Sequence, residues 1–295
     1  MTEETAERIV DMLSEAKVFK LYITGGEPLL WEPLSRIVSY ANSKGVWPLI
    51  QTNGTLLTDS LAKRLVGSKL GVLDISVYGI DETTHNYITG SQSSFRQVSE
   101  ALQKCKRYGI RTCVSFVILK QNLGELTRVF KWGMDKGLDL IHIRRYVAKS
   151  LDDPYRPGNP EAMRTIEEGM KILEEINTPR EKIHVEFEEG FPGHHGLGRD
   201  ICAASSQLCL INVEGRISPC PFIRVYGENA LEGGFRHVWV NSKILNQLRN
   251  IKNFEGICGR CKLRKDCKGG CRAAAYQAYG RFDASDPDCR VVHDK

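Results

Sequence analysis

Four cysteines lie close together near the C-terminus, with the spacing C-x2-C-x5-C-x3-C: Cys258, Cys261, Cys267 and Cys271. Such a loop can wrap around one metal centre, because a C-x2-C turn aims two sulfurs at the same point. Four more cysteines occur in the last third of the chain, namely Cys202, Cys209, Cys220 and Cys289. Eight thiolates are enough for two four-thiolate sites. Zinc, iron–sulfur clusters and free buried thiols are the three interpretations that spacing leaves open.

A second candidate site follows the apolar run FKLYIT (19–24). Gly25 and Gly26 allow a ligand to approach the backbone closely, Glu27 supplies an acceptor for an ammonium group, and Pro28 starts the next segment rigidly. On its own, this tetrapeptide is equally typical of a tight strand-to-helix turn.

The whole cysteine pattern resembles a known family. Cys202 and Cys220 bracket Gly215 as C-x12-G-x4-C, and the cluster from Cys258 to Cys271 and the lone Cys289 follow after gaps. This order is similar to the SPASM domain, the twin-cluster extension at the C-terminus of many radical S-adenosylmethionine (radical SAM) enzymes. The stretch 267–289, CKGGCRAAAYQAYGRFDASDPDC, most resembles the branch that includes haem-biosynthesis enzymes and peptide maturases.

The resemblance implies the ligand sets of two auxiliary [4Fe–4S] clusters. One set is Cys202, Cys220 and Cys271, and the other is Cys258, Cys261, Cys267 and Cys289. Cys209 is either the fourth ligand of the first cluster or a small buried strand residue. If it is not a ligand, the first cluster has an open iron that could bind substrate.

The N-terminal part carries the S-adenosylmethionine side of the same resemblance. Gly25-Gly26-Glu27-Pro28 resembles the motif that holds the amino group of the cofactor. The segments 51–58 (QTNGTLLT) and 75–90 (ISVYGIDETTHNYITG) resemble the third and fourth strand ends of the family's barrel. The resemblance implies that Thr52, Asn53 and Ser76 contact the remaining polar groups of the cofactor.

One defining motif of the family is not found in these 295 residues, namely a C-x3-C-x2-C loop before the first helix. The resemblance therefore implies that the first strand and the cluster that cleaves S-adenosylmethionine are not in this polypeptide. We expect it to generate no 5′-deoxyadenosyl radical alone. Either an upstream start codon has been missed, or the gene is a degenerate or partner-dependent remnant.

The elements that would position these residues alternate along the chain. Amphipathic helices are predicted near 3–16, 33–44, 58–68, 95–108 and 123–136, with glycines near their ends. Apolar strands are predicted over 19–24, 47–52, 72–77, 112–118 and 139–144. This alternation predicts an α/β fold with a parallel sheet, and the family resemblance implies a partial (β/α)6-type TIM barrel that lacks its first strand. Arg144 and Arg145, at the last strand's end, could bind a substrate carboxylate or lie in solvent.

A different pattern follows the barrel segment. A charged helix near 161–175, a strand over 182–187 and a loop over 191–200 are predicted, and then a hairpin around residues 214–215. Helical stretches are predicted at 237–250 and 271–279. We expect two domains, a radical SAM-like partial barrel over 1–190 and a small cysteine-rich SPASM domain over 191–295.

Composition limits the class of protein. The chain has 41 Lys and Arg against 36 Asp and Glu, a net charge of +5 without a basic tail, so nucleic acid binding is not indicated. No apolar run reaches the length of a membrane span, and the first residues do not resemble a signal peptide. A cytoplasmic location is expected, where metal is favoured over disulfides.

The predicted parent activity is radical-mediated modification of a peptide or a tetrapyrrole, with an electron donor such as ferredoxin or flavodoxin. A non-catalytic zinc or iron–sulfur module that binds a peptide is the alternative. Neither the substrate nor a catalytic residue can be identified from the sequence.

Overall fold

The computed structural model describes residues 1–157, 164–169, 171, 184–187 and 202–289. Its internal contacts divide the chain into two units. Unit 1 comprises residues 1–144 and 166–187, and unit 2 comprises residues 145–165 and 188–295. The predicted loop at 191–200 and the predicted domain boundary at 190 lie outside the described residues.

Unit 1 is built on a six-stranded sheet whose order follows the chain, β1-β2-β3-β4-β5-β6. The strands are β1 (Lys20–Ile23), β2 (Trp47–Thr52), β3 (Val72–Val77), β4 (Thr112–Ile118), β5 (Leu140–Arg145) and β6 (His184–Phe187). Strands β1 and β2, β2 and β3, β3 and β4, and β5 and β6 pair in parallel. The α/β class with a parallel sheet is therefore confirmed, and so are the six predicted strands.

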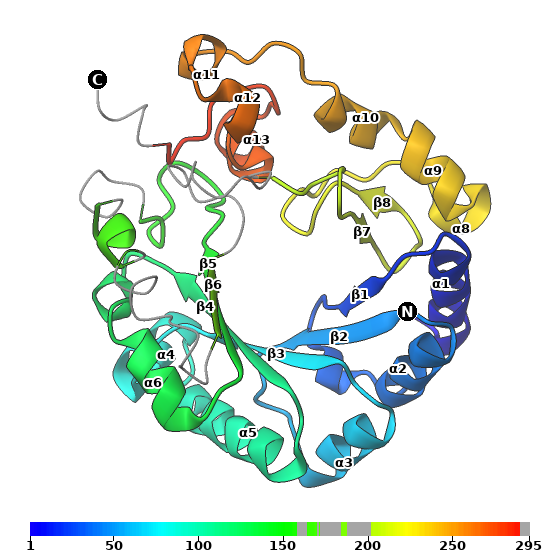
Figure 1. Ribbon diagram of the computed structural model, residues 1–295, viewed down its shortest axis with the longest axis vertical. Helices are drawn as coiled ribbons and strands as arrows, with labels where there is room; N and C mark the ends of the chain where they lie inside the picture. The colour runs from blue at the N-terminus through cyan, green and yellow to red at the C-terminus, as the bar shows by residue number, and fades with distance from the viewer. Residues whose placement is uncertain (158–163, 170, 172–183, 188–201, 290–295) are drawn as a thin grey trace. The chain divides into compact units, whose positions relative to one another are not determined.

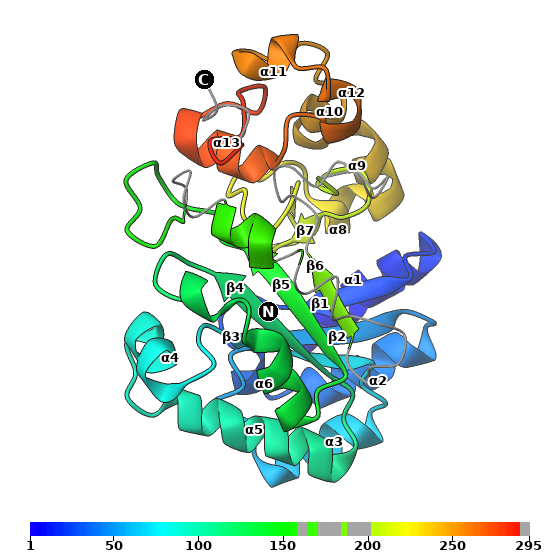
Figure 2. The same ribbon diagram turned by 60° about the vertical axis from the view of Figure 1, so that its left-hand side comes forward.

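Helices before and between the strands lie along one face of this sheet (Figures 1 and 2). They are α1 (Glu3–Glu15), α2 (Leu34–Ser43), α3 (Asp59–Gly67), α4 (Glu82–Thr89), α5 (Ser94–Tyr108) and α6 (Val129–Lys136), with short 3-10 turns η1 (Pro28–Leu30) and η2 (Leu123–Glu125). A core of Ala6, Val10, Ile37, Ala41 and Val46 joins α1 and α2 to the sheet. These apolar positions recur at helical spacing, so burial of one helix face drives the packing.

The two faces of the sheet differ because side chains alternate along each strand. Leu73, Ile75 and Val77 of β3 are buried on the helix-covered face. The opposite, concave face has an apolar layer in which Leu49, Val72 and Cys113 pack together with Trp47 and Leu140. Two positions after Val72, Cys113 and Leu140, on the same face, the side chains are polar: Asp74, Ser115 and His142.

Three local expectations in unit 1 were wrong or incomplete. Helix α4 was not predicted, and α6 begins at Val129 and not near residue 123. Glu125 explains the late start, because its buried carboxylate accepts the Ile80 N–H at 2.6 Å, and residues 123–125 form a 3-10 turn around it. The glycine expected to end α3 is Gly71, but the helix ends earlier, with Ser68 as its C-cap. A Cβ at Gly71 would lie 2.3 Å from Trp47 Nε1, so close packing requires the glycine.

Unit 2 consists of short elements. The predicted hairpin is confirmed as β7 (Leu210–Ile211) antiparallel to β8 (Ile217–Ser218). The helices are α8 (Ala230–Gly233), α9 (Phe235–Asn241), α10 (Lys243–Arg249), α11 (Ile257–Arg260), α12 (Arg264–Cys267) and α13 (Arg272–Tyr279). The helix expected over 237–250 is broken at Ser242, whose ψ of 128° is not helical.

Within the described residues, no helix is long and apolar enough to cross a bilayer. Residues 164–169 of the predicted charged helix are helical.

Candidate functional sites

The turn after β1 fixes the Glu27 carboxylate beside the carboxyl end of β2. Oε1 accepts the Leu29 N–H at 3.0 Å and the hydroxyl of Thr52, and Oε2 accepts the Asn53 N–H at 3.0 Å. Thr52 is buried, and its Oγ1 also accepts the Gly54 N–H at 3.0 Å. Three donors thus orient the carboxylate, and Oε2 retains a lone pair that can accept from a ligand.

The backbone next to Glu27 faces open space. A Cβ built at Gly25 or at Gly26 would meet no atom within 4 Å, and Gly25 has a φ of +131° that other residues rarely adopt. Pro28 occupies the first position of η1 and is buried. The arrangement therefore leaves room for a ligand against the two glycines.

Of the two other residues expected at the cofactor, Asn53 lies next to Glu27 and Ser76 does not. The Asn53 side-chain oxygen accepts from the N–H and the hydroxyl of Thr55, at 2.9 and 2.8 Å. Ser76 lies on β3, half-buried, and hydrogen-bonds Tyr78; burial raises the pKa of Tyr78 and this bond opposes the rise. Glu27, Thr52 and Asn53 are in contact, whereas Ser76 lies one strand further along the sheet.

A polar layer on the concave face was not predicted as a site. Arg144 Nη2 lies 3.0 Å from Asp74 Oδ2, and Arg144 Nε donates to Ser115 Oγ at 2.6 Å. The Ser115 hydroxyl donates to Asp74 Oδ1 at 2.6 Å, which closes a triangle around a buried carboxylate. His142 Nε2 is 2.6 Å from Glu186 Oε2. These residues come from four neighbouring strands, so the layer spans the sheet.

Asp74, Cys113 and His142 offer three ligand atoms within 4.8 Å of one another, the geometry of a small metal site. The Arg144 guanidinium already supplies positive charge there, because Nη2 bonds Asp74 and lies 3.4 Å from His142 Nδ1. Burial raises the pKa of the Cys113 thiol far above its usual value, so this sulfur is protonated. We assign the layer to a charge network.

The eight C-terminal cysteines all belong to unit 2, and their mutual electrostatic effects define a first set. Burial raises the pKa of Cys220 to about 12, and the nearby thiols of Cys271 and Cys202 raise it further. Cys202 acts in the same way on Cys271, whose pKa burial raises to about 11. Cys202, Cys220 and Cys271 therefore lie close to a common point, although they are far apart in sequence.

A second set surrounds α11 and α12. Burial raises the pKa of Cys267 to about 11, and Cys289 and Cys258 add to this rise. Cys261 ends α11, and its N–H donates to the Cys258 carbonyl at 3.3 Å, so it belongs to the same loop.

Cys209 differs from both sets. Burial raises its pKa to about 12, and the only charged group that acts on it among the described residues is Arg249, which lowers the pKa. The structure thus places Cys209 beside an arginine.

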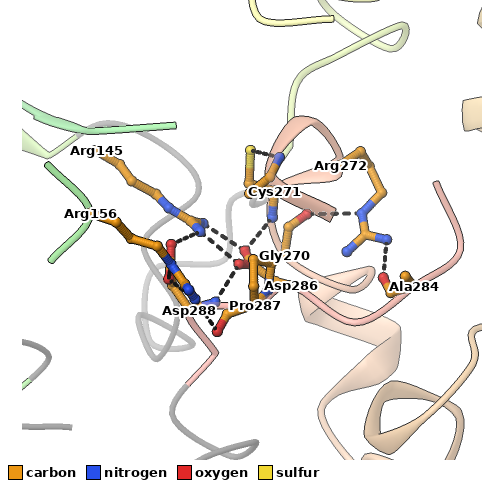
Figure 3. Close-up of polar contacts among 10 residues, drawn as sticks. Arg145, Arg156, Gly270, Cys271, Arg272, Ala284, Asp286, Pro287 and Asp288 are labelled. Carbon is orange, nitrogen blue, oxygen red and sulfur yellow. Dashed lines mark hydrogen bonds and ion pairs between the residues drawn. The ribbon is translucent and has the colours of Figure 1, made fainter. Parts of the chain in front are cut away.

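A buried ion network supports the segment that carries Cys271 and Cys289 (Figure 3). Arg145 Nη1 and Nη2 each donate to Asp286 at 2.6 Å, and Nη2 also donates to Asp288 at 2.7 Å. Arg156 Nε donates to Asp288 Oδ1 at 2.7 Å. Asp286 Oδ2 in turn accepts the Cys271 N–H at 2.8 Å. The network therefore fixes the backbone of one cysteine directly.

Neither arginine at the end of β5 lies free in solvent. Arg145 is 8% exposed and belongs to this network, and Arg144 is paired with Asp74 in the polar layer. Burial opposes ionisation of Asp286, but Arg145 and two N–H donors outweigh it and hold the pKa of this carboxyl below its usual range.

The glycines before Cys271 are required by the same packing. A Cβ at Gly270 would lie 2.5 Å from Asp286 Oδ2, and one at Gly269 would lie 2.6 Å from Arg272 Nη2. Arg272 donates to the carbonyls of Gly270 and Ala284, at 3.2 and 2.8 Å (Figure 3).

Comparison with known proteins adds a family match and relatives over the whole chain. Residues 1–133 match the family model described as Radical SAM superfamily. An AdoMet-dependent heme synthase from Methanosarcina barkeri is 24% identical, over 98% of this chain and 87% of its own length. The mycofactocin maturase MftC from Mycobacterium tuberculosis is 28% identical, over 97% of this chain and 74% of its own length.

Solved structures share the fold. The structure titled "Native anSMEcpe with bound AdoMet and Kp18Cys peptide" superposes with a TM-score of 0.80 at 19% identity, and it covers 100% of this chain and 87% of its own. Streptococcus suis SuiB bound to the precursor peptide SuiA gives a TM-score of 0.76 at 17% identity, over 96% of this chain and 67% of its own. These likenesses confirm the predicted partial-barrel fold class.

Proposed function

Because residues 1–133 match the Radical SAM superfamily model, we propose that the turn after β1 binds the amino group of S-adenosylmethionine. We also propose that unit 2 holds two auxiliary [4Fe–4S] clusters. The observation that carries the cofactor site is the Glu27 carboxylate, which three donors orient beside the open backbone of Gly25 and Gly26. A charged acceptor with a free lone pair, next to space for a ligand, suits an ammonium group. In this proposal Pro28 fixes the turn, and Thr52, Asn53 and Ser76 contact the remaining polar groups of the cofactor.

The thiol arrangement supports clusters over single zinc ions. A tetrahedral zinc site with Zn–S bonds of about 2.3 Å brings its sulfurs to about 3.8 Å from one another. No three of the eight thiols in the described part of unit 2 lie within 4.8 Å of one another. A cube of iron and sulfide is larger than one ion and holds its thiolates further apart.

Buried donors without partners provide an independent test of whether unit 2 suits iron–sulfur clusters. Ser205 Oγ, Arg249 Nη2 and Arg272 Nη2 are buried in unit 2 and have no hydrogen-bond partner among the described residues. Such atoms cost about 1–3 kcal/mol each unless an acceptor is present. The sulfurs of a bound cluster are acceptors of the required kind, so the residues fit the group.

The ligand sets follow from the two groups of cysteines. We assign the first cluster to Cys202, Cys220 and Cys271, with Cys209 as a fourth-ligand candidate, and the second to Cys258, Cys261, Cys267 and Cys289. When bound, auxiliary clusters carry electrons or anchor substrate. The chain's own contribution is the ion network of Arg145 and Asp286, which holds the N–H of Cys271 in place.

For the substrate, we propose a peptide or a tetrapyrrole, since one relative is a maturase and another a heme synthase. The electron donor would be a ferredoxin or flavodoxin, in the cytoplasm. Residues 1–295 contain no C-x3-C-x2-C triplet, so we propose that this polypeptide alone does not cleave S-adenosylmethionine.

The test combines binding with turnover. Anaerobically reconstituted protein is dialysed against labelled S-adenosylmethionine, and 5′-deoxyadenosine is measured after addition of dithionite. We expect saturable binding that is weaker in the Glu27→Gln variant, and no 5′-deoxyadenosine. Absence of binding would refute the cofactor site, and formation of 5′-deoxyadenosine would refute the proposed inactivity of this polypeptide. Colourless protein with stoichiometric zinc would instead support the non-catalytic module.

A further inference from the structure

Two residues of unit 2 that carry unpartnered buried donors, Arg249 and Ser205, are hydrogen-bonded to each other through other atoms. Arg249 Nε donates to the Ser205 carbonyl at 2.5 Å, and both Arg249 Nη2 and Ser205 Oγ lack a partner among the described residues. Ser205 lies between Cys202 and Cys209 in the chain and is 0% exposed. Ser205 thus lies within the segment 202–209, which begins and ends with a cysteine, and Arg249 bonds this segment. Each residue has one donor without an acceptor among the described residues.

The position of Arg249 is fixed from three sides. Besides the bond to Ser205, its Nη1 donates to the Trp239 carbonyl at 2.6 Å, and the guanidinium lies 4.4 Å from the centre of the Trp239 ring. These contacts use Nε, Nη1 and one face, and they leave Nη2 free. A side chain held this firmly cannot rotate its last donor into water without losing them.

Among the described residues, no carboxylate forms an ion pair with Arg249, and Cys209 is the titratable side chain that acts on its pKa. Arg145, the other arginine near the first cysteine set, differs in this respect, since Asp286 and Asp288 balance its charge. In the part of the chain that the structure describes, Arg249 is thus a cation without a carboxylate partner, next to Cys209.

The Ser205 backbone is equally constrained. Its φ is +63°, a left-handed conformation that is unusual for serine, and its N–H bonds the carbonyls of Leu208 and Pro219, at 2.9 and 3.3 Å. This conformation is maintained by tertiary contacts and sets the direction of the side chain.

We propose that Arg249 Nη2 and Ser205 Oγ donate hydrogen bonds to sulfur atoms of the cluster held by Cys202, Cys220 and Cys271, and that Arg249 raises the reduction potential of that cluster. The inference rests on the proposed iron–sulfur function. Reduction adds one negative charge to the cluster, so a fixed cation and donors to sulfur favour the reduced form. Arg249 acts here as a tuning residue and takes no part in the chemistry itself.

The test is a redox titration of reconstituted protein, followed by electron paramagnetic resonance. In the Arg249→Met variant we expect the ratio of reduced to oxidised first cluster, at a fixed potential, to fall about tenfold, which is a midpoint lower by about 59 mV for one electron. Arg249→Lys keeps the charge and should shift less, and Ser205→Ala should lower the midpoint by a smaller amount. Arg224→Met, which removes an exposed charge in the same unit, is the control and should shift nothing.

Pulsed resonance on protein with 15N-labelled arginine provides a second readout that needs no variant to fold. The wild-type protein should show a weak nitrogen coupling to the reduced first cluster, and Arg249→Lys should remove the part of the coupling that Arg249 contributes, while any coupling from Arg272 stays. Unchanged midpoints in Arg249→Met with both clusters bound, no coupling in the wild type, or a coupling as strong in Arg249→Lys as in the wild type would each overturn the inference. A wild-type protein that binds no iron would instead refute the proposed function.

Discussion

The buried carboxylate of Asp286 allows a sharp prediction. Its Oδ2 accepts from Arg145 Nη1 and the Cys271 N–H, and its Oδ1 accepts from Arg145 Nη2 and the Asp288 N–H. In Asp286→Asn, either orientation of the amide turns an NH2 group toward two of these donors. Two hydrogen bonds are lost whichever way the side chain lies, and Arg145 keeps Asp288 but loses the charge of Asp286.

The expected magnitude follows from the burial of the pair. Breaking a buried ion pair by changing one partner costs about 3–5 kcal/mol. Asp288 still contacts Arg145 at 2.7 Å, so we expect the lower end, about 3 kcal/mol. The matched control is Asp283→Asn. Asp283 pairs with Arg281 at 2.7 Å with side chains 35% and 42% exposed, and we expect a loss of no more than about 1 kcal/mol.

The assay is hydrogen exchange of peptides that span α13, because Cys271 is the N-cap of this helix and Asp286 fixes its N–H. Asp286→Asn should lower the free energy of opening of α13 by about 3 kcal/mol, and Asp283→Asn should leave it nearly unchanged. Equal effects of the two variants would refute the reasoning, since they would show that burial of the network contributes nothing to the cysteine segment.

Two further predictions concern unit 1. Glu27→Gln should weaken S-adenosylmethionine binding by about 10- to 100-fold, since hydrogen bonds to charged groups contribute about 1.5–3 kcal/mol. The control Glu32→Gln changes a side chain that is 79% exposed and should not weaken binding. Calorimetric titration measures both affinities, and equal affinities of wild type and Glu27→Gln would refute the site. Burial lowers the pKa of His85 to about 4, so the unfolded chain binds a proton first and the stability of unit 1 should fall as the pH drops from about 6.5 toward 4. Urea denaturation of His85→Gln should show a flatter dependence over this range, and an unchanged slope would contradict the assignment.

Strands and most helices of unit 1 could be predicted because each is bounded by turn residues and carries one clear period. Helix α4 was missed because its eight residues, ETTHNYIT, have no apolar stripe, although Asp81 and Gly90 mark its ends. The break at Ser242 was also missed, because the residues on both sides continue a helical pattern.

The candidate sites were predictable to different degrees. Motif spacing identified Glu27 and the cysteines, because local sequence determines them. The partners of Asp74 and Arg145 depend on long-range pairing of strands and loops, which the sequence pattern does not determine. A signal was present, since charged residues inside otherwise apolar central strands must find partners. It indicated pairing and left the identity of each partner open.

The central claim is that unit 2 binds two clusters through two separate sets of thiols. Iron and sulfide analysis with Mössbauer spectroscopy of reconstituted protein tests it most directly. We predict about eight irons per chain in the wild type and about four in each of two variants, Cys220→Ser and Cys267→Ser. An iron content that falls to zero in either variant, or stoichiometric zinc with no iron in the wild type, would contradict the claim.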